Sequence, residues 1–181
     1  LIDPGHGGDE RGVRLSETLY EKDVTLAIAR MIQRDLSESG RIGVQLTRND
    51  DRALTTAQRA AVAARLRPQL LLGLHVNAGF GRKASGYELY FPGFGMSRTP
   101  GAGQAVGKDG TKTAYLNDGV RFAQLAGRHM ERVFPRKGRG LRAAEIPLLE
   151  GMTLPAVVVE IGFATHPDDR KAIEDPATQK A

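Results

Sequence analysis

The chain has 181 residues, 40% of them hydrophobic and 26% charged, which is typical of one compact globular domain and argues against long disordered stretches. It contains no cysteine, which excludes disulfides and thiolate metal sites. The net charge of +5 comes from scattered basic residues without an aromatic-rich basic motif, so nucleic acid is not an expected partner, and no apolar run reaches the roughly 20 residues that a membrane span requires.

The first half of the chain alternates between apolar strands and amphipathic helices. Residues 1–3 are interpreted as the end of a buried strand, and the sequence PGHGG follows them directly. A helix is predicted over about 20–39, because apolar side chains recur there at helical spacing and Gly40 ends the pattern. Further along, we predict a strand at 44–47, a helix at 55–66, a strand at 70–77 and a strand at 86–91. The nearly continuous apolar sequence LLLGLHVN at 70–77 is typical of a strand covered on both faces.

The second half begins with a segment rich in glycine, proline, serine and threonine. We expect residues 92–117 to form a long insertion loop, followed by a helix over about 118–133. The basic sequence PRKGRGLR at 135–142 is interpreted as a solvated loop. Strands are predicted at 146–151 and 156–163, and a last helix at 166–175. The alternation predicts an α/β fold in a single domain over 1–181: a layered, mixed and mostly parallel sheet flanked by helices.

Polar side chains mark the ends of the apolar strands. His6 follows the first strand, His75 lies in the last turn of LLLGLHVN, and Glu160 interrupts AVVVEIGF. The carboxyl ends of parallel strands line the ligand cleft of such sheets, so these three side chains can meet there. Glu21 stands at the start of the first long helix, where a carboxylate suits the helix dipole.

Each of these residues also has a purely structural interpretation. His6 can be a turn residue, His75 a satisfied core histidine, and Glu21 a solvated charge in a first helical turn. Glu160 differs, because a carboxylate within a Val/Ile run is costly to bury unless it is paired, metal-bound or protonated. The remaining histidines are interpreted as surface or helix-end residues: His129 and His166.

The four singled-out residues together suit metal-assisted hydrolysis. Two histidines and one carboxylate can hold Zn²⁺ and leave a position for water. Bound zinc lowers the pKa of that water to roughly 7, and a second carboxylate is then needed to carry a proton to the leaving amine. This set is supplied by His6, Glu21, His75 and Glu160. The four lie far apart and match no local signature such as HExxH, so their spacing alone does not define a metal site.

Six motifs in order carry a resemblance to a known family: IDPGHGG, EKDVTLAIA, VQLTR, LLLGLHVNA, GYELYF and PAVVVEIGF. The series resembles the zinc-dependent N-acetylmuramoyl-L-alanine amidases of the type-3 family, over nearly the whole chain except 92–117. The resemblance implies an α/β fold similar to that of zinc carboxypeptidases, a phosphorylase/hydrolase-like fold. It also implies hydrolysis of the amide bond between N-acetylmuramic acid and the first L-alanine of the stem peptide in peptidoglycan.

By motif, the resemblance also implies roles for single residues. The implied ligands of one Zn²⁺ per chain are His6, Glu21 and His75. Glu160 is implied as the catalytic carboxylate, and Asn77 as a residue that contacts substrate or orients the site. Arg48 and Arg59 also match the family pattern, and a structural role under the cleft is expected for both.

The resemblance further implies partners and a location. The expected partners are peptidoglycan, which is an anionic cell-wall polymer, and an activator protein. The expected location is periplasmic, secreted or associated with the cell wall, and the expected setting is cell-wall degradation, with cell division as one case.

Two segments depart from the family pattern. The chain reads VEIGFATHPDD where the family often reads VEIGFLSN, which affects one outer contact and not the metal site. Some relatives carry an inserted helix near 92–117 that blocks the cleft, but this segment lacks a long amphipathic pattern. We therefore expect a flexible loop that rims the cleft rather than an autoinhibitory helix.

Three other interpretations remain open at this point. A zinc carboxypeptidase or another peptidase would use the same layered fold. A wall-binding domain would keep the fold without the chemistry, although all four zinc and acid positions are present. A phosphate-binding loop at GHGG would need a P-loop lysine or a GxGxxG pattern, and neither follows.

Overall fold

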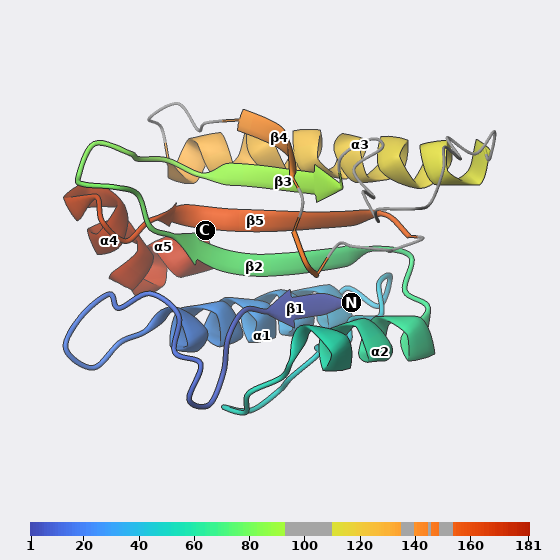
Figure 1. Cartoon of the computed structure of the whole chain (residues 1–181), viewed down its shortest axis with the longest axis horizontal. Helices are drawn as coiled ribbons and strands as arrows, with labels where there is room; N and C mark the ends of the chain where they lie inside the picture. The colour runs from blue at the N-terminus through green and yellow to red at the C-terminus, as the bar shows by residue number, and fades with distance from the viewer. Residues whose placement is uncertain (93–109, 135–139, 145, 149–153) are drawn as a thin grey trace, which may run out of the picture.

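The described residues form a five-stranded sheet at the centre of the molecule (Figure 1). The computed structural model describes residues 1–92, 110–134, 140–144, 146–148 and 154–181. The strands are β1 (Ile2–Pro4), β2 (Leu71–Asn77), β3 (Glu88–Pro92), β4 (Gly140–Ala144) and β5 (Ala156–Phe163). They lie in the order β1-β2-β5-β3-β4. The pairs β1–β2, β2–β5 and β3–β4 are parallel, whereas β3–β5 is antiparallel, so the predicted mixed, mostly parallel sheet is confirmed.

The helices flank this sheet (Figure 1). In the described part of the chain they are α1 (Glu21–Glu38), α2 (Thr56–Leu66), α3 (Gly110–Val133), α4 (Pro167–Glu174) and α5 (Pro176–Lys180). The first turn of α1 is capped because the Tyr20 N–H donates to Asp23 Oδ2 at 3.0 Å. A reciprocal capping box begins α2, where Thr55 Oγ1 accepts from the Gln58 N–H and Gln58 Oε1 accepts from the Thr55 N–H. The helices predicted at 20–39, 55–66 and 166–175 are thus confirmed to within one or two residues.

The two faces of the sheet carry different clusters of apolar side chains. The main core lies on the face covered by α1 and α3, and its members include Ile2, Val24, Ile28, Ala29, Leu74, Val76, Leu89, Ala123, Val157 and Val159. The opposite face carries a smaller cluster of Leu71, Leu148, Ala156 and Val158. Side chains alternate along a strand, so His75, Glu88 and Glu160 lie on this second face together with the smaller cluster. The strand predicted at 70–77 is therefore covered on both faces, as expected.

The prediction of a strand at 44–47 is wrong. The segment makes only an isolated parallel bridge between Leu46 and Ile2, in which the Ile2 N–H donates to the Gln45 carbonyl and the Thr47 N–H donates to the Ile2 carbonyl. The physical reason is that Pro4, the next residue of β1 on this edge, has no N–H to donate, and its carbonyl accepts from Arg48 and Arg59 instead. Beyond the bridge, the chain turns so that Thr47 and Arg48 reach the buried polar groups of β1.

Three predictions next to the segments outside the described residues also need correction. The expected loop 92–117 lies largely outside the described residues, but Pro92 belongs to β3 and helix α3 already begins at Gly110. The basic run at 135–142, interpreted as a loop, ends in edge strand β4, where charged side chains are tolerated because one strand edge faces water. Residues 146–148 of the strand predicted at 146–151 form a turn, since Pro147 has no N–H to donate to a ladder. The remainder of that segment, 149–151, lies outside the described residues.

A search of the described residues for a helix both long and apolar enough to cross a membrane finds none.

Candidate metal centre and active site

His6 enters the site from the turn that follows β1. Its backbone φ of 60° lies in the left-handed region, which residues with a Cβ rarely adopt. The glycine before it is required by close packing. A Cβ on Gly5 would lie 2.5 Å from His75 Cε1 and 2.8 Å from the carbonyl oxygen of Leu74. The glycine-rich sequence therefore allows the turn that bears His6 to approach β2 closely.

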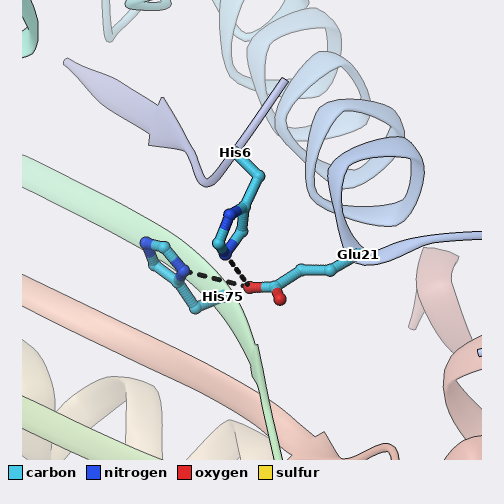
Figure 2. Close-up of side chains that lie close together, drawn as sticks. All are labelled: His6, Glu21 and His75. Atoms are coloured by element: carbon cyan, nitrogen blue, oxygen red, sulfur yellow. Dashed lines mark hydrogen bonds and ion pairs between the residues drawn. The ribbon is translucent and has the colours of Figure 1, made fainter. Parts of the chain in front are cut away.

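The carboxylate of Glu21 lies between the imidazoles of His6 and His75 (Figure 2). Its Oε1 is 3.2 Å from His6 Nε2 and 3.0 Å from His75 Nδ1. The two rings are nearly perpendicular, with centroids 5.3 Å apart. The three residues offer ligand atoms that all lie within 4.8 Å of one another. The fold thus brings together three side chains from the turn after β1, the first residue of α1 and strand β2.

Hydrogen bonds keep Glu21 ionised although only 2% of it is exposed. Burial raises its pKa, but the bonds from His6, His75 and the backbone N–H groups of Val13 and Val76 outweigh burial and lower the pKa to about 2. Burial lowers the pKa of His75, but the hydrogen bond and the negative charge of Glu21 raise it above its usual value. The resting arrangement is therefore an anionic carboxylate held between two imidazoles.

Glu160 lies beside this cluster on the same face of the sheet. It is the register partner of His75 on the adjacent parallel strand β5. Burial raises the pKa of Glu160 to about 7; His75 opposes that rise, while the negative charges of Glu21 and Glu88 add to it. Its Oε2 is buried and has no hydrogen-bond partner among the described residues. A carboxyl group that titrates near neutral pH and keeps one oxygen uncommitted suits a proton carrier.

Glu88 is a buried carboxylate of the same face that sequence reasoning missed. It is the register partner of Glu160 on β3, and only 2% of it is exposed. Its Oε2 accepts hydrogen bonds from Asn77 Nδ2 and the Tyr90 hydroxyl, both at 2.6 Å, and Arg142 lies 3.9 Å from its Oε1. The strict alternation within GYELYF was the signal that could have found it, because a strand with a core face must place this glutamate opposite that face.

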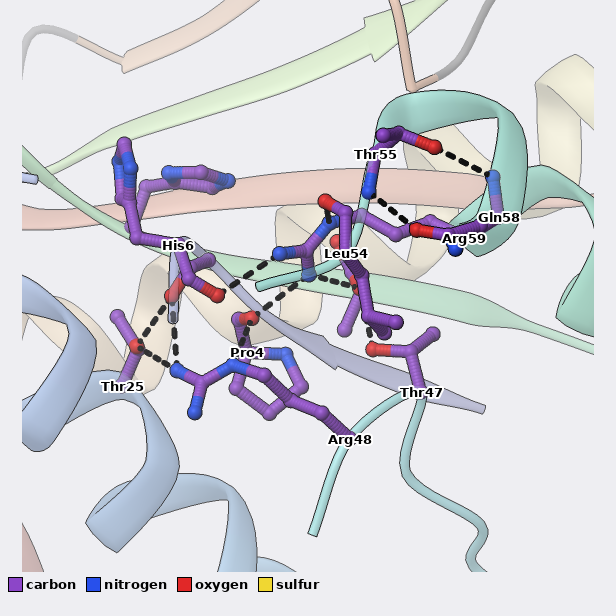
Figure 3. Close-up of polar contacts among 12 residues, drawn as sticks. Pro4, His6, Thr25, Thr47, Arg48, Leu54, Thr55, Gln58 and Arg59 are labelled. Atoms are coloured by element: carbon purple, nitrogen blue, oxygen red, sulfur yellow. Dashed lines mark hydrogen bonds and ion pairs between the residues drawn. The ribbon is translucent and has the colours of Figure 1, made fainter. Parts of the chain in front are cut away.

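Two buried arginines lie beneath the turn that bears His6, as the sequence predicted (Figure 3). Arg59 reaches the turn from α2 and pairs with Asp3 of β1 at 2.7 Å. Arg48 reaches it from the segment after the isolated bridge, and its Nε donates to the Pro4 carbonyl at 3.1 Å. Both side chains therefore contact the backbone of the first strand from below the site.

A cleft of about 620 Å³ opens beside the two histidines. One wall comes from the N-terminal end of α2 and the loop before it, with Leu54 and Gln58, and another includes Leu148 of the smaller apolar cluster. The side chains of His6 and His75 are 30% and 27% exposed, whereas the Glu21 side chain is 2% exposed. The imidazoles are thus accessible to a substrate in the cleft, whereas the carboxylate of Glu21 between them is buried.

The other two histidines occupy the places predicted for them. His129 is exposed on α3. His166 caps α4, where its Nδ1 accepts from the Asp169 N–H at 3.4 Å.

Comparison with known proteins decides the family. Residues 1–181 match the protein family described as N-acetylmuramoyl-L-alanine amidase. The chain belongs to this amidase family. Zinc dependence is a general property of the family, and the described residues contain a His/Glu/His group of the kind that holds such an ion. The amidase interpretation is thereby favoured over a carboxypeptidase and over a phosphate-binding loop.

Curated relatives agree with the amidase assignment. YqiI, an uncharacterized protein of Bacillus subtilis, is 30% identical over 168 residues, which cover 93% of this chain and 71% of YqiI. The N-acetylmuramoyl-L-alanine amidase LytC of the same organism is 27% identical over 174 residues, which cover 96% of this chain and 31% of LytC. The amidase AmiC of Escherichia coli is 22% identical over 203 residues, which cover 99% of this chain and 49% of AmiC. The chain thus spans less than half the length of these two amidases.

Solved amidase structures share the fold. The catalytic domain of the amidase CwlV from Bacillus (Paenibacillus) polymyxa superposes with a TM-score of 0.76 at 25% identity, covering 99% of this chain and 88% of that one. An N-acetylmuramoyl-L-alanine amidase of Clostridium difficile 630 superposes with a TM-score of 0.75 at 28% identity, covering 99% of this chain and 87% of that one. The family, the α/β fold class and the enzyme class expected from the six motifs are confirmed.

Proposed function

We propose that this amidase domain cleaves the N-acetylmuramoyl–L-alanine bond with a zinc ion held by His6, Glu21 and His75, and with Glu160 as the proton carrier. One observation supports the proposal above all others: an ionised carboxylate lies between two imidazoles, and a second carboxyl group is in register with one of them. Two imidazole nitrogens and one carboxylate oxygen are a donor set typical of catalytic zinc sites.

The contacts of Glu21 indicate which atoms would bind the ion. Its Oε2 accepts the Val13 N–H at 2.9 Å, whereas its Oε1 accepts the Val76 N–H at 3.0 Å and is also the oxygen that both histidines approach. We therefore assign the ligand atoms as Glu21 Oε1, His6 Nε2 and His75 Nδ1. The backbone N–H groups that hold the carboxylate keep it deprotonated, which is the state a ligand needs.

A zinc ion in this site would polarise the scissile carbonyl and lower the pKa of a bound water to about 7. Glu160 removes a proton from the attacking water and delivers it to the amide nitrogen as the C–N bond breaks. The hydroxyl part of the water remains on the acyl carbon. The products are the lactyl carboxylate of N-acetylmuramic acid and a stem peptide with a free L-alanine amine.

Asn77 is proposed to contact the substrate through its amide oxygen. Its Nδ2 donates to Glu88 Oε2 at 2.6 Å, and a carboxylate can only accept, so the amide orientation is determined. The side chain is half-buried, and its amide oxygen Oδ1 is then the group proposed to accept a hydrogen bond from a substrate N–H. An amide substrate with several N–H groups along a peptide offers such donors.

The substrate and the setting of the whole protein remain proposals. Peptidoglycan is the substrate that fits an amidase of this family. We therefore propose a location where the cell wall lies: periplasmic, secreted or wall-associated. The CwlD amidase of Clostridioides difficile was solved in complex with the GerS lipoprotein, but at 24% identity that likeness shows a shared fold, so an activator protein stays a prediction. A role in cell division also stays a prediction, as does the single-domain organisation of 1–181.

The proposed cleft-rimming loop falls largely on 93–109, outside the described residues.

Muropeptide analysis tests the proposed reaction. Purified protein with a measured zinc content is incubated with isolated peptidoglycan, and the soluble products are identified by mass spectrometry. The expected products are intact stem peptides with an L-alanine amino terminus and glycan with free lactyl carboxylates. A chelator should abolish their release, and added zinc should restore it.

Other products would contradict the proposal in distinct ways. Release of a single C-terminal amino acid would indicate a carboxypeptidase. Unchanged release of stem peptides after complete metal removal would contradict the zinc site while leaving the amidase activity in place.

A further inference from the structure

The backbone of the turn that bears His6 has an unusual set of hydrogen-bond partners (Figure 3). The carbonyl groups of three successive residues, Pro4, Gly5 and His6, accept hydrogen bonds from buried guanidinium groups. Arg59 donates from Nη2 to the His6 carbonyl at 2.8 Å and from Nη1 to the Pro4 carbonyl at 2.9 Å. The chain thus leaves the sheet ladder after β1 and is held by side chains from two other segments.

Arg48 joins the two segments that carry the proposed metal ligands. Its Nη2 donates to the Gly5 carbonyl at 2.9 Å and to the Lys22 carbonyl at 2.8 Å. Gly5 precedes His6, and Lys22 follows Glu21, so one guanidinium group spans the His6 turn and the first turn of α1. The Thr25 hydroxyl of α1 adds a third link, because it donates to the Gly5 carbonyl at 3.0 Å.

These contacts hold a conformation that the turn would not favour by itself. His6 has a φ of 60°, and residues with a Cβ avoid this region unless surrounding contacts impose it. The Gly5 carbonyl belongs to the peptide before the His6 Cα, the His6 carbonyl belongs to the peptide after it, and each accepts a hydrogen bond from one of the two arginines. Together these bonds restrain the φ and ψ of His6, and with them the direction in which its side chain leaves the backbone.

Burial of Arg48 is costly for a purely structural contact. Its side chain is fully buried, and no ion pair joins it to a carboxylate within the described part of the chain. Burial also lowers its pKa, which reflects the cost of keeping the charge out of water. Its hydrogen-bond acceptors are neutral carbonyl and hydroxyl groups, and the negative charges of Asp51, Asp3 and Asp23 offset only part of the cost of burial.

We propose that Arg48 and Arg59 are positioning residues of the metal centre, which hold His6 and Glu21 in the mutual geometry that an ion requires. The inference rests on the proposed zinc site. In proteins, groups that orient metal ligands from outside typically change metal affinity by about 10–100-fold when they are replaced. The two arginines act through backbone carbonyls rather than through the ring nitrogens, so their effect falls on ligand placement and not on ligand basicity.

Zinc affinity of full-length variants tests the proposal directly. Arg48→Lys and Arg59→Lys keep the charge, but one ammonium group cannot span the separated carbonyls that each guanidinium contacts. Zinc dissociation constants are measured by competition with a chromophoric chelator, and the visible spectrum of the cobalt-loaded protein reports ligand geometry. Each variant should bind zinc about 10–100-fold more weakly and show an altered cobalt spectrum. Arg65→Lys, on the exposed face of the same helix as Arg59, is the matched control and should leave both readouts unchanged.

Thr25→Val provides a milder second variant should a lysine variant fail to fold. It removes one hydroxyl link to the Gly5 carbonyl and keeps the side-chain shape. We expect a smaller loss of zinc affinity, about 3–10-fold. The proposal is overturned if the folded variants keep wild-type zinc affinity and cobalt spectrum while only their unfolding temperature falls. Failure of the wild-type protein to bind zinc would instead contradict the proposed function itself.

Discussion

His75 and Glu160 are register partners on the parallel strands β2 and β5. The pairing places an imidazole and a carboxyl group side by side on one face of the sheet, although 85 positions separate them in the chain. His75 also faces Glu21 at 3.0 Å, so it lies between the carboxylate proposed as a ligand and the carboxyl group proposed as the proton carrier. Register between two neighbouring strands thus sets the spacing between the proposed metal ligand and the proposed proton carrier.

Replacement of Glu160 should separate catalysis from metal binding. In Glu160→Gln, peptidoglycan hydrolysis is expected to fall by about 10²–10⁴-fold, because the carrier of the proton is lost while the three proposed ligands remain. Zinc content measured by atomic emission should equal that of the wild type. Glu38→Gln, an exposed change at the far end of α1, serves as the control. Full activity of Glu160→Gln would remove the proposed role.

The same substitution should change how stability depends on pH in the metal-free protein. Glu160 has a folded-state pKa of about 7 against 4.5 for the free side chain. Between these values the unfolded chain gives up a proton that the folded chain keeps, so stability falls as the pH rises from about 4.5 to 7. The loss amounts to at most about 3 kcal/mol.

Chemical denaturation in the presence of a chelator measures this effect. Glu160→Gln cannot ionise, so it should be more stable than the wild type at pH 8 and of similar stability at pH 4. An equal difference at both pH values would show that the effect comes from packing and not from the charge.

A methyl group on Gly5 should damage the metal centre through sterics alone. The Cβ of Gly5→Ala would lie 2.6 Å from His75 Nδ1, the proposed ligand atom, and 2.8 Å from the backbone oxygen of Leu74. We expect a loss of about 1–3 kcal/mol in unfolding free energy and weaker zinc binding, because the imidazole must move. Gly43→Ala, where an added Cβ meets nothing within 4 Å, should change neither quantity.

Loss of the Glu21 charge should weaken zinc binding more than any change outside the ligand set. Glu21→Gln keeps the side-chain shape but removes the anionic oxygen that both imidazoles approach. We expect zinc affinity to fall by more than 100-fold, beyond the range for outer contacts. Competition with a chelating dye measures the change. A dissociation constant within tenfold of the wild type would exclude Glu21 as a ligand.

Elements with a strong local signal were predictable. The apolar runs that contain His75 and Glu160 indicated buried strands, and the helical spacing after Tyr20 indicated α1. Prediction of secondary structure failed where the local composition favoured one structure and the neighbouring strand allowed another. Residues 44–47 have a strand-like composition, but Pro4 of β1 has no N–H with which to continue the ladder beyond the bridge at Leu46. Strand β4 follows a basic run that indicated a loop, and it forms because β3 offers an edge to pair with.

The candidate site shows the same division. The residue types of His6, Glu21, His75 and Glu160 suited metal-assisted hydrolysis, and the family resemblance implied the zinc site. The motif series was sufficient to predict the amidase family, which is confirmed. The roles of the single residues stay predictions. Glu88 was missed although alternation places it on the face opposite the core, because only the pairing of β3 with β5 shows that this face also carries Glu160.

By itself, the sequence determined the chemical groups and the local elements, because side-chain type, helical spacing and apolar runs act over a few residues. The tertiary structure decided which groups meet. The parallel register of β2 with β5 brings His75 to Glu160, and the guanidinium groups beneath the first turn bring His6 to Glu21. Such contacts depend on pairing between distant segments, and that pairing is set by the energy of the whole packed sheet rather than by any short stretch of residues.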